Sequence, residues 1–226
     1  MIVVIHGLTE TPAIALANAG WPAAVVKHRF ILVAPAGVLS SWNAGGCCAP
    51  AQQAGINDVG FIDKVLDQIS ARSDVDMDKV FMVGGSNGGM MTYKYLCTGT
   101  HHIVAAASVA GTSVAGCSPA SPVSIMQIHG LDDHTVPYRG GASLISTVLG
   151  VSFDAVPASL AALAATERCS PTSTDTSNRG VTTKTWTGCT NDVTVRLVGI
   201  AGLDHVWPVA PLYDGTGQIL KFFAIS

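Results

Sequence analysis

One serine in this chain stands in a glycine-rich turn that could make it a nucleophile. Residues 84–88 read Gly-Gly-Ser-Asn-Gly, which places Ser86 at the centre of a G-x-S-x-G pattern. The pattern is typical of a tight turn that holds a serine hydroxyl above the end of a sheet. Glycine suits the outer positions because side chains there would collide across the turn. The alternative is a glycine-rich turn whose serine only caps a helix, so Ser86 needs chemical partners elsewhere.

A serine hydroxyl becomes a nucleophile when a nearby base removes its proton, and that base needs an acid to orient it. His205 is the candidate base, because it alone of the seven histidines follows the last predicted strand, residues 193–198. The acid should follow an earlier strand, and Asp132 and Asp133 compete for this role. Asp133 is favoured because it keeps the spacing D-x-x-V-P. Asp132 would then be a turn residue that satisfies local backbone N–H groups.

An oxyanion that develops during attack by the serine needs two preorganised N–H donors. The backbone of Asn87, directly after the serine, supplies one donor, and Leu8 is the simplest source of the second. His6, His129 and His134 are expected to shape loops by hydrogen bonding rather than to titrate in catalysis. The mechanism requires no metal or other cofactor, and the sequence shows no cluster of metal ligands.

The elements that must position these residues alternate between strands and helices. Short apolar runs predict buried strands at residues 2–5, 30–34, 80–83, 103–109, 123–128 and 193–198. Apolar residues at helical spacing over 57–72 predict one of the intervening helices. Such alternation implies parallel βαβ units with helices on both faces of the sheet. We therefore expect an α/β fold with a mostly parallel sheet of about six strands, in a single domain over residues 1–226.

Composition argues against several classes of protein. The chain is 48% hydrophobic and only 12% charged, which makes disorder an unfavourable interpretation. A net charge of −3 without a basic run argues against a nucleic-acid partner. No apolar stretch is long enough to span a membrane, so no membrane partner is expected. Because residue 1 leads directly into a predicted strand, we expect no signal peptide in this chain.

The six cysteines nevertheless indicate an oxidising compartment. Their spacing does not match a zinc site, so we expect disulfides in a secreted protein whose export signal lies outside this sequence. Free thiols in the cytosol are the alternative. Cys169 and Cys189 bracket a polar segment, expected to be irregular, and are the pair that we favour. The remaining four would then pair across the chain, with Cys97 and Cys117 joining the neighbouring Cys47 and Cys48.

Together these residues give the chain a resemblance to the esterases grouped as polyhydroxybutyrate depolymerases and feruloyl or acetylxylan esterases. The matching segments, which cover nearly the whole chain in order, are IHG at 5–7, SWNAGGCC at 41–48, NDVGFI at 57–62, GGSNGGMM at 84–91, HGLDDHTVPY at 129–138 and DHVWP at 204–208. The resemblance implies an α/β-hydrolase fold, secretion, and hydrolysis of carboxylic esters without a cofactor. It places Ser86, Asp133 and His205 on the family's catalytic triad, and Leu8 and Asn87 on its oxyanion positions.

The chain departs from this family in two places. The N-terminal strands that usually precede the strand ending in His-Gly are missing, and Leu8 stands where relatives often carry cysteine. A backbone donor survives that change.

The sequence is less informative about the substrate. Trp207, next to His205, and Trp42 are candidates to line an acyl or aromatic pocket, although both could serve packing alone. We rank small aryl, short-acyl or hydroxycinnamoyl esters first and polyester chains second. A serine peptidase and a non-catalytic binding protein on the same scaffold rank lower. The sequence does not indicate the oligomeric state.

Overall fold

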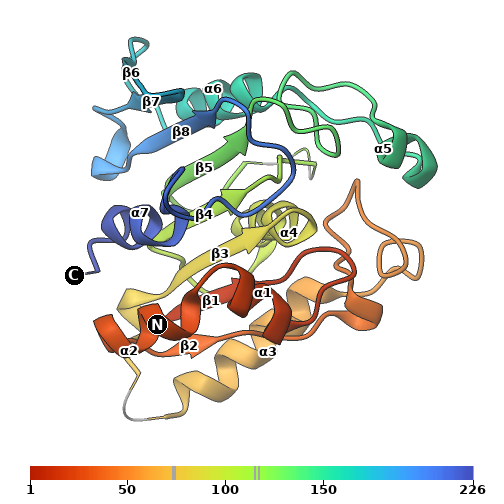
Figure 1. The fold of residues 1–226 in the computed structure, drawn as a ribbon. Coiled ribbons are helices and arrows are strands. Elements are labelled where there is room, and N and C mark those ends of the chain that lie inside the picture. The colour runs from red at the N-terminus through yellow and green to blue at the C-terminus, as the bar shows by residue number, and fades with distance from the viewer. Residues whose placement is uncertain (73–74, 115, 117, 226) are drawn as a thin grey trace.

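A central sheet carries helices on both of its faces (Figure 1). The computed structural model describes residues 1–72, 75–114, 116 and 118–225. The strands are β1 (Ile2–Ile5), β2 (Leu32–Val33), β3 (Phe81–Gly85), β4 (Ala105–Val109), β5 (Ser124–Gly130), β6 (Thr174–Asn178), β7 (Val181–Trp186) and β8 (Val195–Ile200). The α-helices are α1 (Pro12–Asn18), α2 (Trp21–His28), α3 (Asp58–Ser70), α4 (Asn87–Thr98), α5 (Leu144–Leu149), α6 (Val156–Thr166) and α7 (Gly215–Phe222).

The eight strands of the described residues form one sheet in the order β2-β1-β3-β4-β5-β8-β7-β6. Neighbouring strands from β2 to β8 in this order are parallel, whereas β7 is antiparallel to both of its neighbours. The prediction of a mostly parallel α/β sheet is therefore confirmed. All six expected strands are present, but β2 is reduced to two residues and two further strands extend the sheet.

The two further strands correct the prediction that residues 169–189 are irregular. β6 and β7 form a hairpin whose turn residues, Arg179 and Gly180, both have positive φ (49° and 79°). Positive φ at both central positions is the feature of a two-residue turn that matches the twist of a hairpin. The strand β6 is exposed along its whole length at the edge of the sheet. Threonine and serine suit such an edge, so the segment is polar without being irregular.

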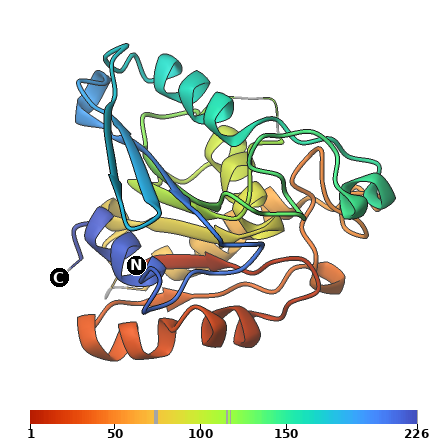
Figure 2. The same cartoon turned by 45° about the horizontal axis from the view of Figure 1, so that its top comes forward.

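The core lies on both faces of the sheet, and alternate residues of each strand contribute to opposite faces. Val3 and Ile5 of β1 face the side covered by α3, α4 and α6. Ile2 and Val4 face the side covered by α2 and α7, with α1 packed nearby. Figure 2 shows α4 and α6 on one side of the sheet and α1 and α2 on the other. Burial on both faces explains why the strands read as continuous apolar runs.

The disulfides confirm one predicted pair and correct the others. Cys169 is bonded to Cys189, as expected. Cys47 and Cys48 are bonded to each other, so the prediction that they join Cys97 and Cys117 is wrong. Cys97 is also part of a disulfide, and Cys117 lies outside the described residues. Spacing along the chain could not decide these pairings, because six cysteines allow 15 arrangements.

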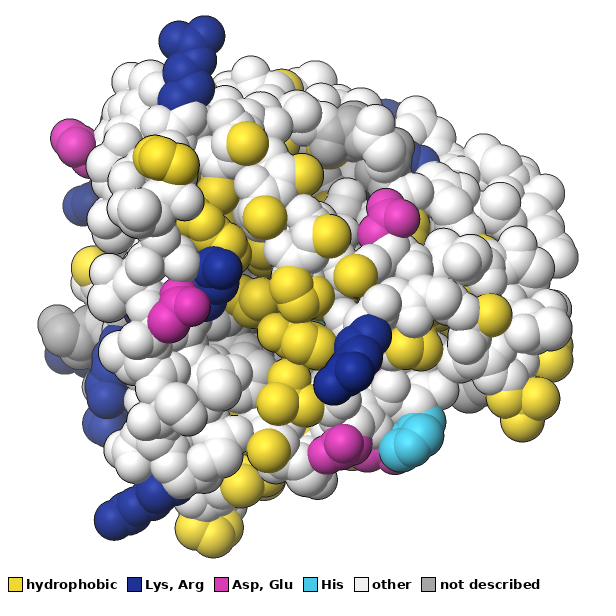
Figure 3. Space-filling model, turned by 90° about the horizontal axis from the view of Figure 1, so that it is seen from above, with side chains coloured by type: hydrophobic (Ala, Val, Ile, Leu, Met, Phe, Trp, Pro, Cys, Tyr) yellow, Lys and Arg dark blue, Asp and Glu magenta, His cyan; other side chains and the backbone are white. Residues whose placement is uncertain are grey.

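The surface above α6 and the β6–β7 hairpin shows how sparsely the chain is charged. Figure 3 shows apolar side chains gathered along the middle of this face, with basic and acidic side chains scattered around them. Among the described residues, no helix combines the length and the apolar character needed to cross a membrane.

Candidate active site

The candidate residues lie together at one end of the sheet, where the parallel strands have their carboxyl ends. Leu8 follows β1, Ser86 follows β3, Asp133 follows β5 and His205 follows β8. In open α/β sheets, ligands bind outside these carboxyl ends. Ser86 and His205, which are separated by 119 positions in the sequence, thus become neighbours.

Ser86 occupies a strained turn between β3 and α4, with φ 50° and ψ −120°. Such backbone geometry costs free energy for a residue with a side chain and is often found at functional sites. The flanking glycines make the turn possible. A Cβ at Gly84 would collide with the backbone of Gly88, and a Cβ at Gly88 would collide with the carbonyl oxygens of Ile5 and His6. The collision expected across the turn is therefore present at Gly84, whereas Gly88 is required by the close approach of Ile5 and His6.

The structure brings Ser86, His205 and Asp133 into one hydrogen-bonded line. His205 Nε2 lies 2.8 Å from Ser86 Oγ, and His205 Nδ1 lies 2.8 Å from Asp133 Oδ2. Because a carboxylate accepts hydrogen bonds and does not donate them, the imidazole carries its proton on Nδ1. Nε2 is then free to accept the hydroxyl proton of Ser86. The Asp133 side chain is fully buried, whereas the His205 ring is 20% exposed and reachable.

Hydrogen bonds around Asp133 keep its carboxyl group ionised. Burial alone would raise the pKa of Asp133, but hydrogen bonds from His129, His205 and the Val136 N–H outweigh it and hold the pKa well below its usual range. His129 Nε2 lies 3.2 Å from Oδ2, while the N–H groups of Thr135 and Val136 donate to Oδ1 at 2.9 and 2.8 Å. Asp133 can therefore stabilise a positive charge on His205.

Two other aspartates tie the loop of the acid to the loop of the base. Asp132 Oδ2 accepts the N–H of Gly202 at 2.7 Å, so it reaches across to the loop after β8. Asp204 Oδ1 accepts the N–H of His134 at 2.9 Å and that of His205 at 2.8 Å. Of the two competing aspartates, Asp133 is the one that contacts the His205 ring. The role of Asp204 was missed in the sequence, where only its place next to His205 marked it.

Leu8 and Asn87 present backbone N–H groups near Ser86. Asn87 is the first residue of α4, where backbone N–H groups have no partner within the helix. Leu8 lies in the turn after β1 and lines the same cavity as Ser86. Within the described residues, neither N–H donates to another group of the chain. Both are therefore available to an oxyanion.

A cavity of about 520 Å³ opens beside Ser86 and His205. Its walls include Trp207 and Leu8, in keeping with the expected apolar pocket. Trp42 does not line the cavity and is fully buried, so it offers no surface to a substrate. The prediction that Trp42 binds substrate is therefore corrected. Its ring packs against the ring of His6, with the two ring centroids 4.9 Å apart.

The three histidines expected to shape loops make such contacts. His6 Nδ1 lies 2.8 Å from Gly7 O, His129 Nε2 lies 2.8 Å from Val136 O, and His134 Nδ1 lies 3.3 Å from Asp204 Oδ2. Among the described residues, no group of three or more His, Cys, Asp and Glu side chains is arranged to hold a metal ion.

The fold is shared with solved esterases. The acetyl xylan esterase from Aspergillus awamori superposes with a TM-score of 0.69 over 100% of this chain and 88% of its own, at 15% sequence identity. Esterase PE8 superposes with a TM-score of 0.62 over 100% of this chain and 92% of its own, at 17% identity. This chain has the α/β-hydrolase fold.

Sequence similarity extends to named esterases over part of the chain. Feruloyl esterase C of Emericella nidulans is 32% identical over 119 residues, which are 52% of this chain and 40% of that protein. The bifunctional acetylxylan esterase/xylanase XynS20E of Neocallimastix patriciarum is 28% identical over 142 residues, which are 62% of this chain and 20% of that protein. The matches thus span less than half of these relatives, and no protein-family model matches the chain. The polyhydroxybutyrate depolymerase part of the resemblance stays a prediction.

Proposed function

We propose that this α/β-hydrolase is a serine esterase that hydrolyses carboxylic esters through an acyl-enzyme. The observation that carries the proposal is the line of two 2.8 Å hydrogen bonds from Ser86 through His205 to Asp133, at the wall of a cavity. The relatives named as feruloyl and acetylxylan esterases support the same reaction. Since a single sheet carries all three residues, we also propose that residues 1–226 work as one catalytic domain.

In the first half of the reaction, Ser86 Oγ attacks the carbonyl carbon of the ester while its proton moves to His205 Nε2. Asp133 stabilises the imidazolium that forms. The carbonyl oxygen becomes an oxyanion and accepts hydrogen bonds from the N–H groups of Leu8 and Asn87. The position of Asn87 at the start of α4 adds the positive end of the helix dipole. The tetrahedral intermediate then collapses, and the alcohol leaves with the proton from Nε2.

In the second half, water attacks the acyl group on Ser86. His205 Nε2 takes a proton from this water, and the same two N–H groups stabilise the second oxyanion. Collapse of the intermediate returns the proton to Ser86 Oγ and releases the carboxylic acid. No metal or other cofactor takes part in any of these steps.

We propose small aryl, short-acyl and hydroxycinnamoyl esters as substrates. The cavity has room for an acyl group of this size, and Trp207 provides an aromatic wall next to His205. Val206 and Val209 also line the cavity and are about half exposed (53% and 54%). Because exposed apolar side chains on the cavity wall could also contact a polymer outside the cavity, we propose polyester chains as a second class of substrate.

The disulfides support a location outside the cytosol. Cys47–Cys48 and Cys169–Cys189 are both formed, and such bonds persist in oxidising compartments. We therefore propose that the protein is secreted.

The test compares the wild type with Ser86→Ala on nitrophenyl acetate. The wild type should show a burst of nitrophenol or steady turnover, and the variant should lose at least about a thousandfold in kcat/KM, because removal of a triad member costs several orders of magnitude. Ser70→Ala, on the exposed side of α3, is the matched control and should keep its activity. If Ser86→Ala keeps a rate within tenfold of the wild type, the proposed mechanism is wrong.

A panel of nitrophenyl butyrate, methyl ferulate, acetylated xylan and polyhydroxybutyrate film then separates the proposed substrates. Preference for the film would favour the polyester class. Preference for methyl ferulate or the short nitrophenyl esters would favour the first class.

A further inference from the structure

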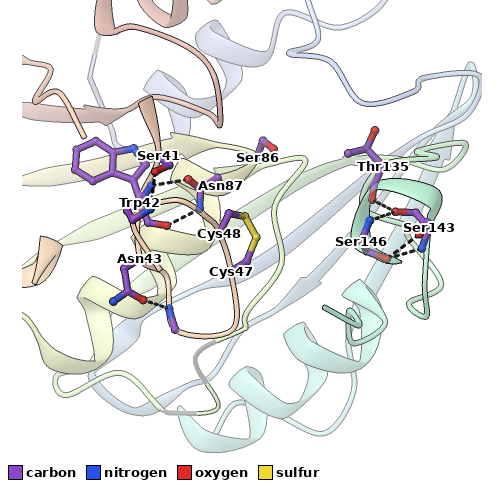
Figure 4. Close-up of a disulfide and its surroundings, with 12 residues drawn as sticks. Ser41, Trp42, Asn43, Cys47, Cys48, Ser86, Asn87, Thr135, Ser143 and Ser146 are labelled. Carbon is purple, nitrogen blue, oxygen red and sulfur yellow. Dashed lines mark hydrogen bonds between the residues drawn. A yellow bond between two sulfur atoms is a disulfide. The ribbon is translucent and has the colours of Figure 1, made fainter. Parts of the chain in front are cut away.

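Trp42 lies on a hydrogen-bonded path between the two loops that hold Leu8 and Asn87. One end of the path is the side chain of Asn87, which makes two hydrogen bonds to the backbone of Trp42. The Trp42 N–H donates to Asn87 Oδ1 at 2.8 Å, and Asn87 Nδ2 donates to the Trp42 carbonyl at 3.0 Å. Figure 4 shows both bonds, with Ser86 beside Asn87 and the Cys47–Cys48 disulfide below. Asn87 is thus hydrogen-bonded to Trp42, in the segment of residues 41–48.

The other end of the path is the indole of Trp42, which reaches the turn after β1. Its Nε1–H donates to the carbonyl oxygen of His6 at 3.0 Å. His6 in turn lies with Nδ1 2.8 Å from Gly7 O and accepts the N–H of Gly37 on Nε2 at 2.9 Å. The peptide group bound by Trp42 is therefore the one that leads into Gly7 and Leu8.

Sheet hydrogen bonds do not hold these two loops together. The paired residues of β1 and β3 end at Ile5 and Gly84, before either donor is reached. Trp42 and Asn87 are both essentially buried (0% and 1% exposed), so water does not compete for their hydrogen bonds. The hydrogen bonds of Trp42 therefore connect the loop after β1 with the start of α4, beyond the last paired residues of β1 and β3.

We propose that Trp42 is a positioning residue that sets the distance between the two oxyanion donors, Leu8 N–H and Asn87 N–H. This inference rests on the proposed esterase function. An oxyanion is stabilised fully only when both donors lie within about 2.7–3.1 Å of it. Trp42 acts on the transition state through the loops and not by touching the substrate, because it is absent from the cavity wall.

The test replaces the indole while keeping an aromatic ring. Trp42→Phe removes the donor to the His6 carbonyl, and its backbone bonds to Asn87 remain possible. Trp186→Phe is the matched control, because Trp186 is also buried (6% exposed) but lies on β7. Asn87→Asp breaks the path at its other end, since an aspartate cannot donate to the Trp42 carbonyl. This variant tests the inference if Trp42→Phe does not fold.

The measurements are kcat and KM on nitrophenyl acetate, and the Kd of phenylboronic acid. A boronic acid adds to the serine oxygen and forms a tetrahedral adduct that resembles the transition state. We expect Trp42→Phe to lower kcat about tenfold and to raise the Kd of phenylboronic acid by a similar factor, with KM within about twofold. The expected loss is smaller than the 10²–10³-fold loss of kcat on removing a donor, because Trp42→Phe only misplaces one. Trp186→Phe should leave all three values within about twofold, although both variants lower the melting temperature.

The outcomes separate this inference from the proposed function. If Ser86→Ala abolishes activity but Trp42→Phe keeps both kcat and the boronic acid Kd within twofold of the wild type, the positioning role is wrong. Equal losses in Trp42→Phe and Trp186→Phe would also overturn it, since they would report general damage to the core. Full activity in Ser86→Ala would instead refute the esterase mechanism itself.

Discussion

Replacement of His129 by phenylalanine should weaken both the fold and the reaction. His129 is buried (1% exposed) and belongs to a chain of polar groups that leads to Asp133 of the proposed triad. The Tyr93 hydroxyl donates to Gln127 Oε1 at 2.8 Å, and Gln127 Nε2 lies 3.1 Å from His129 Nδ1. His129 Nε2 then lies 3.2 Å from Asp133 Oδ2. Because Nδ1 accepts from Gln127, the ring is neutral and its single proton on Nε2 points toward Asp133 and the Val136 carbonyl.

The magnitude follows from the groups that lose a partner. A hydrogen bond to a charged group contributes about 1.5–3 kcal/mol. Phenylalanine removes this donor from Asp133 and from the Val136 carbonyl and leaves the Gln127 amide with one acceptor fewer. We therefore expect the free energy of unfolding to fall by about 3 kcal/mol, which for a chain of this length lowers the melting temperature by about 6–12 °C.

The effect on the reaction should be smaller than that of losing the nucleophile. Asp133 keeps the N–H donors of Thr135 and Val136 and the ring of His205. Without His129 its pKa moves up toward the ordinary value, since the first of the hydrogen bonds that lower it is lost. We expect kcat to fall about tenfold at pH 7, with a further loss in acid that the wild type does not show.

The assay is urea unfolding at pH 7 together with a pH profile of kcat on nitrophenyl acetate. His129→Gln is the matched variant, because its amide nitrogen can replace the imidazole Nε2–H toward Asp133. It should recover most of the activity. A free energy of unfolding for His129→Phe within about 0.5 kcal/mol of the wild type would refute the reasoning. Equal kcat and equal pH profiles in the two variants would also refute it.

Two further predictions concern acid stability and a disulfide. Burial lowers the pKa of His6 below its ordinary value of 6.5, so the unfolded chain binds this proton first and the free energy of unfolding falls as the pH drops through 6.5 and below. His6→Asn should flatten that slope in urea titrations, and parallel curves would contradict it. Replacing Cys169 and Cys189 by serine opens a loop of sequence separation 20 and should lower the free energy of unfolding by about 3 kcal/mol. Since this pair lies beyond the amino end of β8, opposite His205, kcat should stay within about twofold; a large loss of kcat without a loss of stability would count against this expectation.

Features that depend on interactions between residues close together in the chain could be predicted from the sequence. The apolar runs predicted six of the eight described strands, β1 to β5 and β8, because strands buried on both faces must be apolar at every position. The G-x-S-x-G pattern located the turn at Ser86 for a similar reason, since a Cβ at Gly84 would collide with Gly88 within the turn itself. The order of the strands then implied that the loops carrying Asp133 and His205 would meet Ser86.

Features that depend on the arrangement of distant segments in space could not be predicted from the sequence. The β6–β7 hairpin is polar because it lies at the edge of the sheet, and edge position is decided by the order of strands. The pairing of Cys47 with Cys48 was hidden for a related reason, since every cysteine had several possible partners.

Trp42 and Asp204 show most clearly what the sequence and the tertiary structure each contribute to this protein. The sequence by itself determined the buried strands, the nucleophile turn and the candidate base, because local sterics and apolar periodicity act between near neighbours in the chain. Only the tertiary structure decided that Trp42 is buried against His6 instead of facing a substrate, and that Asp204 binds the N–H of His134. Hydrogen bonds between distant loops depend on the position of both partners in space, and that position exists only after the sheet has formed.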